Sequence, residues 1–107
     1  MAKSKIETYI GFCVKSREIA IGSGAVSTLH GGVRLIILDG TSAKNSWRLA
    51  LKFKNRFTCP LIICKSGFED VVNKCGAKIA AVLNKELAKA ILNNLDDNYE
   101  LYAGGTI

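Results

Sequence analysis

The segment Gly22-Ser23-Gly24 combines residue types that suit the binding of an anion. It follows a short apolar stretch at Ile19–Ile21 and precedes residues with helical spacing. At such a turn the first backbone N–H groups of a helix lack intrahelical partners, and together with the helix dipole they attract a phosphate oxygen. The two glycines have no Cβ to block a close approach, and the serine adds a hydroxyl. The same turn also serves as an ordinary structural cap, which is the interpretation we favour when this segment is taken alone.

A row of basic residues follows in the segment 42–57, which is predicted to be helical. Four cations spaced by four residues form one ridge, and no Asp or Glu occurs from Thr41 to Phe57. The functional interpretation is contact with a phosphate backbone; the structural one, which we favour at this stage, is a solvated basic face. The ridge residues are Lys44, Arg48, Lys52 and Arg56, and the predicted core side is Trp47, Ala50, Leu51, Phe53 and Phe57.

No set of residues combines a nucleophile, a base and an oxyanion site, so we predict no enzyme. The one histidine, His30, lies at a predicted helix end with no triad partner near it in sequence. Asp39 follows a predicted strand, but the sequence Asp39-Gly40-Thr41-Ser42 is ordinary turn and cap chemistry. Neither G-x-G-x-x-G nor G-x-x-x-x-G-K-[ST] occurs, and we predict no cofactor and no metal.

The overall composition is that of a globular protein with an anionic partner. A chain of 107 residues, 49% hydrophobic and 22% charged, fits a single domain over residues 1–107. The formal net charge of +6 favours nucleic acid first and an acidic membrane surface second. The first residues lack a signal-peptide pattern, and no apolar run approaches the roughly 20 residues that span a bilayer. The four cysteines form no C-x-x-C pair, so we expect them to be reduced thiols that act as small apolar residues in the cytoplasm. They are Cys13, Cys59, Cys64 and Cys75.

The hydrophobic pattern alternates between helical and strand-like segments, which predicts an α/β fold. We expect a three-layer α/β/α sandwich with a small mixed β-sheet of about four strands. A capping box of Ser4 and Glu7 opens the first helix, Gly31-Gly32 stop the second, and the tail after residue 95 is expected to fray or pack weakly. The predicted helices are 4–15, 23–30, 42–57, 68–74 and 86–95, and the predicted strands are 19–21, 33–38, 59–64 and 77–83.

Three stretches together resemble one known family of RNA-binding proteins. They are "YIGFCVKSREIAIGSGAV", "GGVRLIILDGTSAKNS" with "CPLIIC", and "VVNKCGAKIAAVLNKELAKAI". In order and spacing they are similar to the ribosomal L-seven-Ae family, which includes the L-thirty-e proteins, and most of all to its bacterial YlxQ-like branch. The resemblance covers nearly the whole chain, although each motif is loose. It implies the same sandwich, no catalysis, and binding of structured RNA, often a kink-turn, in the ribosome or another ribonucleoprotein.

The resemblance also implies an RNA-binding site made of two segments. The first is the turn that opens the second helix, and the second is the loop before the last of the predicted strands. The implied RNA-binding residues are Gly22, Ser23, Gly24, Ala25 and Thr28 in the first segment, and Gly76, Ala77, Lys78 and Ile79 in the second, flanked by Lys65 and Lys74. We add Lys15, Arg17 and Arg34 as cations near the turn.

The chain departs from the family at the residues that read bases. Kink-turn binders usually carry Asn-Glu where this chain has Gly24 and Ala25, and Lys where it has Thr28. Because base edges specify sequence while phosphate contacts position the protein, we expect binding of structured RNA, ribosomal RNA first, through phosphates and shape. The alternative is a protein-interaction module that has lost kink-turn binding, and a third hypothesis is a small-molecule site in the crevice at the strand ends.

Overall fold

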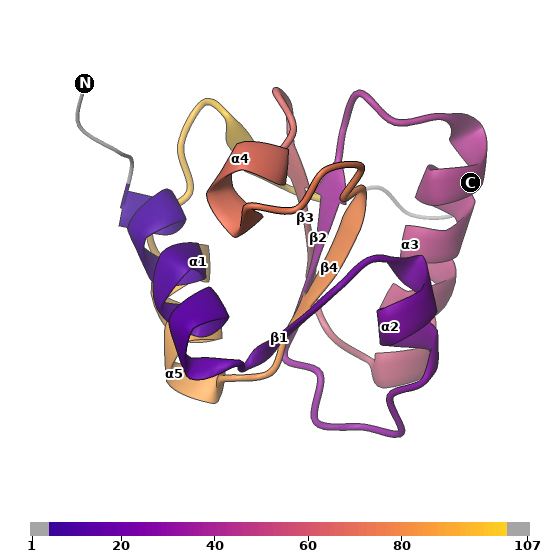
Figure 1. Ribbon diagram of the computed structural model, residues 1–107, viewed down its shortest axis with the longest axis horizontal. Coiled ribbons are helices and arrows are strands. Elements are labelled where there is room, and N and C mark those ends of the chain that lie inside the picture. The colour runs from indigo at the N-terminus through magenta and orange to yellow at the C-terminus, as the bar shows by residue number, and fades with distance from the viewer. Residues whose placement is uncertain (1–4, 103–107) are drawn as a thin grey trace.

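The structure, a computed structural model, describes residues 5–102 and shows a sheet between two layers of helices (Figure 1). This arrangement confirms the predicted α/β class and its three layers. The elements in chain order are α1 (Lys5–Ser16), β1 (Ile19–Ile21), α2 (Ser23–Ser27), β2 (Leu35–Asp39), α3 (Lys44–Phe57), β3 (Leu61–Cys64), α4 (Glu69–Val72), β4 (Ile79–Val82), α5 (Lys85–Leu92) and β5 (Tyr99–Leu101).

The sheet has five strands in the order β1-β4-β2-β3-β5, one more than the expected four or so. It is mixed, as predicted: β2 and β3 run parallel, and every other pair is antiparallel. The additional strand comes from the tail that was expected to fray. Tyr99 pairs with Cys64 and is only 1% exposed, so burial of one aromatic ring holds a segment whose neighbours are polar.

The two faces of the sheet bury separate apolar clusters. Helices α1, α4 and α5 cover one face, where Ile6, Ile10 and Ile91 pack against alternate strand residues. Helices α2 and α3 cover the other face, to which Val26 and Phe53 contribute. Every residue of β2 is buried, which confirms that its apolar run reads as a strand covered on both faces.

Local hydrogen bonds explain where the observed helices differ from the predicted ones. Helix α2 ends at Ser27, three residues before His30, and the Arg56 guanidinium donates to the Ser27 and Leu29 carbonyl oxygens at this end, at 3.1 and 2.8 Å. Helix α3 begins at Lys44, since the Ser42 hydroxyl donates to the Asp39 carbonyl oxygen. The predicted capping serine, Ser4, lies outside the described residues.

The strand register defines two ends of the sheet, and the site depends on this division. At what we call the glycine-turn end, Ile21 lies opposite Ala80, and Leu38 lies opposite Ile79. At the opposite end, both Ile19 and Leu35 lie opposite Val82. No helix within residues 5–102 is long and apolar enough to cross a membrane.

Candidate nucleic-acid interface

The two segments that the sequence predicts as one site do meet at the glycine-turn end of the sheet. The Gly22 N–H donates to the Ile79 carbonyl oxygen at 2.7 Å. The Lys74 ammonium lies 3.4 Å from the Ile21 carbonyl oxygen, although the two residues are 53 positions apart in sequence. Antiparallel pairing of β1 with β4 creates this junction, because it places the end of one strand beside the start of the other.

The turn itself presents exposed backbone. Gly22 has φ 97° and ψ 150°, a conformation available almost only to glycine, and no side chain caps the helix at this position. Ser23, Gly24 and Ala25 are exposed, while Val26 anchors α2 in the core. The Thr28 hydroxyl lies one turn further on and donates to the Ala25 carbonyl oxygen at 2.8 Å. The surface around Ser23–Ala25 is therefore open to a ligand.

The second segment is less available than the resemblance implies. The Gly76 N–H donates to the Glu69 carboxylate, so its amide already has an anionic partner. Ala77 is buried against the α1 side of the core, and Ile79 belongs to β4. Lys74 and Cys75 are exposed. Of this segment, Lys74 is the predicted residue whose charge is exposed near the turn; its ammonium contacts the Ile21 carbonyl oxygen and forms no ion pair among residues 5–102.

Lys78 is engaged by Asp39. Its ammonium lies 3.3 Å from Asp39 Oδ2, and the Lys78 side chain is 42% exposed while that of Asp39 is 3% exposed. The Thr41 backbone N–H and hydroxyl both donate to Asp39 Oδ1, at 2.8 and 2.6 Å. Burial works to raise the pKa of Asp39, but the bonds from Thr41 and Lys78 outweigh it and hold this pKa below its usual value.

The Asp39 carboxylate already has hydrogen-bond and ion-pair partners, which argues against the small-molecule hypothesis. Asp39 is the polar group that the sequence places where α/β folds often bind ligands, and it is committed to Thr41 and Lys78. Gly67, at φ +85°, lets the chain pass so close that an added Cβ would lie 3.0 Å from Asp39 Oδ2. This end of β2 is therefore filled by protein atoms.

Four of the predicted cations lie away from the turn. Lys15 and Arg17 lie at the opposite end of the sheet, because they come just before β1 begins, where α1 ends beside Glu18. Arg34 lies there too, because its N–H donates to the Val82 carbonyl oxygen. Ile19 and Ile21, the ends of β1, are two residue steps or about 7 Å apart along the strand. Lys65 follows β3, which lies three strand positions from β1 across the sheet, and its ammonium pairs with Glu100 at 3.5 Å. Of the predicted site residues, the structure thus unites Gly22–Thr28 with the segment 74–79, in which Ala77 and Ile79 are buried.

Two residues that the sequence did not assign to this interface, Glu69 and Arg56, contact its segments. The Glu69 carboxylate, on helix α4, accepts a hydrogen bond from the Gly76 N–H, and the Arg56 guanidinium of α3 donates to the end of α2. No local pattern signals the Glu69 contact, which depends on how the chain folds back across seven residues. Arg56 belongs to the four-residue ridge, so its helix face was predictable, whereas its partner in α2 was not.

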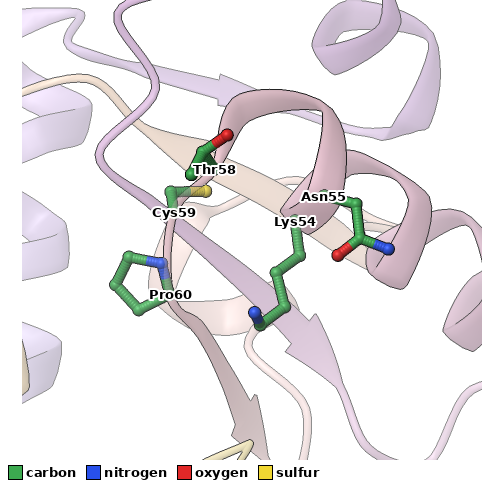
Figure 2. Close-up of a pocket in the computed structure, with 5 residues that line it drawn as sticks. All are labelled: Lys54, Asn55, Thr58, Cys59 and Pro60. Atoms are coloured by element: carbon green, nitrogen blue, oxygen red, sulfur yellow. The ribbon is translucent and has the colours of Figure 1, made fainter. Parts of the chain in front are cut away.

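The structure also holds a hollow of about 310 Å³ outside this interface. Figure 2 shows its five lining residues where α3 passes into β3: Lys54, Asn55, Thr58, Cys59 and Pro60. Burial raises the pKa of Cys59 to about 11, so its thiol is protonated at neutral pH and is a poor nucleophile. Within residues 5–102, no three His, Cys, Asp or Glu side chains gather as a metal site requires.

Comparison with known proteins shows the fold and leaves the family open. A solved structure described as "The structure of a protein with unknown function from Bacillus halodurans C" is similar, with a TM-score of 0.71 and 14% sequence identity over 85% of this chain and 96% of that chain. No protein-family model matches the sequence. No curated protein matches it either.

Proposed function

We propose that the protein is a cytoplasmic, non-catalytic RNA-binding protein that contacts structured RNA, ribosomal RNA foremost, mainly through phosphates. The observation that carries this proposal is the junction at the glycine-turn end. There the exposed backbone of Ser23–Ala25 and the Lys74 ammonium converge from distant parts of the sequence. The two segments for which the resemblance to the L-seven-Ae family implies RNA binding thus lie side by side.

The chemistry of the junction favours phosphate contact over base reading. Gly24 and Ala25 carry no side chain that could hydrogen-bond a base edge, whereas a glycine turn allows a phosphate to approach the backbone closely. The Thr28 hydroxyl is already bonded to its own helix. Sequence preference should therefore be weak, and binding should depend on RNA shape and charge.

Salt dependence tests this proposal directly. Fluorescence anisotropy with labelled fragments of ribosomal RNA would be measured between about 50 and 200 mM salt. If about four phosphates are neutralised, affinity should fall roughly a hundredfold across this range. Absence of binding at micromolar protein, or affinity that is indifferent to salt, would contradict the proposal.

A matched pair of variants locates the site. Lys74→Ala should weaken binding about equally for all RNAs and should lower the salt slope by about 1. Lys89→Ala removes the same charge from an exposed position on α5, in the other helical layer, and should leave binding unchanged. Equal effects of the two substitutions would indicate that only the overall charge matters.

The protein-interaction alternative receives less support. An apolar surface with exposed cysteines would favour it, but Cys13, Cys59 and Cys64 are buried and Cys75 is the exposed one. Phe12 and Leu101 are the large hydrophobic side chains that are exposed among the described residues, and they lie on separate elements, α1 and β5. Neither forms a patch at the glycine-turn end.

A further inference from the structure

Acidic and basic residues are divided unequally between the two helical layers. From residue 19 to residue 68 the one acidic residue is Asp39, which is buried and paired with Lys78. The layer formed by α2, α3 and their flanking loops, residues 22–34 and 40–60, carries six basic residues and no acidic one. In the rest of the chain nine Lys and Arg balance nine Asp and Glu, so the net charge of +6 belongs to this layer. Its basic residues are Arg34, Lys44, Arg48, Lys52, Lys54 and Arg56.

Three of these cations form an exposed row on one rigid helix, which we call the α3 ridge: Lys44, Arg48 and Lys52. A spacing of four residues separates neighbours by about 6 Å along the helix axis. None of the three takes part in an ion pair among residues 5–102. Ala50 and Phe53 bury the opposite side of α3 against the sheet, so the row is held in place by the core.

Arg56 connects this row to the candidate interface. Its guanidinium donates to the carbonyl oxygens of Ser27 and Leu29 and lies 4.9 Å from the centre of the Phe57 ring. The last member of the four-residue pattern is therefore fixed against α2, and the face of α3 that carries the ridge borders the helix that begins at the glycine turn. Figure 1 shows α2 and α3 side by side on this face of the sheet.

We propose that the α3 ridge binds the sugar–phosphate backbone of the RNA whose other contact is the glycine turn, so that a duplex segment crosses the α2/α3 layer. This inference rests on the proposed function and adds a second contact surface to it. A row of cations without acidic neighbours gains more from a polyanion than from a single phosphate, since each neutralised phosphate releases counterions. The ridge thus supplies affinity without reading sequence.

The packing of α3 favours RNA over a membrane surface as the polyanion. A helix that binds a bilayer surface places its apolar side among the lipids. The apolar side of α3 is instead packed on the sheet through Ala50 and Phe53, and Trp47 is half-buried. The exposed residues of α3 are cations together with the polar Asn45 and Asn55, which is the character of a phosphate-binding face.

The test compares two triple variants that lose the same charge. The ridge variant is Lys44→Gln, Arg48→Gln and Lys52→Gln; the control variant is Lys5→Gln, Lys85→Gln and Lys89→Gln, all exposed residues of the other layer. The probes are the ribosomal RNA fragment bound by the unmodified protein and a labelled 16-base-pair RNA duplex. For the ridge variant the slope of log affinity against log salt should fall by about 2 to 3, with the control unchanged.

Each outcome decides between the possibilities. A ridge variant that matches the control overturns the inference while RNA binding by the unmodified protein stands. An unmodified protein that binds neither RNA refutes the proposed function itself. Ridge-dependent binding to phosphatidylglycerol vesicles, without ridge-dependent binding to RNA, also overturns the inference. If the triple variant does not fold, Arg48→Gln alone should lower the slope by about 1, and Lys44→Arg with Lys52→Arg should leave it unchanged.

Discussion

Lys78 and Asp39 form an ion pair across 3.3 Å in which the carboxylate is buried and the ammonium is half-exposed. The pair joins the start of β4 to the end of β2, beside the point where the backbone turns at Gly22 and Gly40. It fixes the loop before β4 and at the same time withdraws one predicted phosphate contact. The ion pair thus competes with the proposed phosphate contact for the same lysine.

Acid should destabilise the protein partly through Asp39. Because its pKa is lowered on folding, its contribution is complete above the unfolded value of about 3.9 and is lost as the pH falls through the lower folded value. Asp39→Asn should reduce the free energy of unfolding at pH 7 by about 1–3 kcal/mol and should flatten this acid dependence. Urea unfolding between about pH 2.5 and 7 measures both effects. An unchanged acid slope in the variant would count against the assignment.

The glycine turn provides a pair of substitutions with opposite effects. Gly22→Ala forces a side chain into φ 97° and should cost about 1–3 kcal/mol of stability, although nothing lies within 4 Å of the added Cβ. Gly24→Ala, within α2 and equally open, should be neutral or stabilising by up to about 1 kcal/mol. Thermal unfolding of both variants gives the comparison. Equal effects of the two substitutions would show that the backbone conformation of Gly22 is not what selects glycine there.

Thiol chemistry should separate one cysteine from the other three. Cys75 is exposed, whereas Cys13, Cys59 and Cys64 are buried, so a maleimide should label one thiol rapidly in the native protein and four after unfolding. Cys75→Ser should abolish the rapid reaction. A second thiol that reacts at the same rate in the native state would contradict the packing described.

The buried thiols should also make stability depend on alkaline pH. Burial raises the pKa of Cys13 and of Cys59 to about 11, above the unfolded value of about 8.5. The folded state therefore keeps protons that the unfolded state loses, and the free energy of unfolding should fall as the pH rises from about 8.5 towards 11. Urea unfolding at stepped pH tests this, and Cys13→Ala with Cys59→Ala should reduce the dependence.

Strand β5 should contribute strongly to stability despite its short length. Tyr99→Ala empties a position that is 1% exposed and should cost about 3–5 kcal/mol. Leu101→Ala, in the same strand but 43% exposed, should change stability by about 0.5 kcal/mol or less. Chemical denaturation of the two variants decides whether the ring or the strand pairing holds this segment. Similar losses of stability in the two variants would indicate that backbone pairing of β5 with β3, and not the Tyr99 ring, holds the segment.

The sequence alone determined the elements that have a strong internal period or a continuous apolar run. The run at Val33–Leu38 predicted β2, and the spacing of Trp47, Ala50 and Phe53 predicted the buried side of α3. Both signals are local, because one face or both faces of an element must be apolar to be buried. The α/β class and its layers follow from their alternation along the chain.

Tertiary structure decided what depends on distant partners. The tail forms strand β5 because Tyr99 packs in the core beside β3. No local periodicity in the sequence indicates this packing. The glycine turn met Lys74 because β1 pairs with β4, and the same register carried Arg17 and Arg34 to the opposite end of the sheet. A charge is visible in the sequence, but the side of the fold on which it lies is set by strand order and register, which arise from packing between residues far apart in the chain.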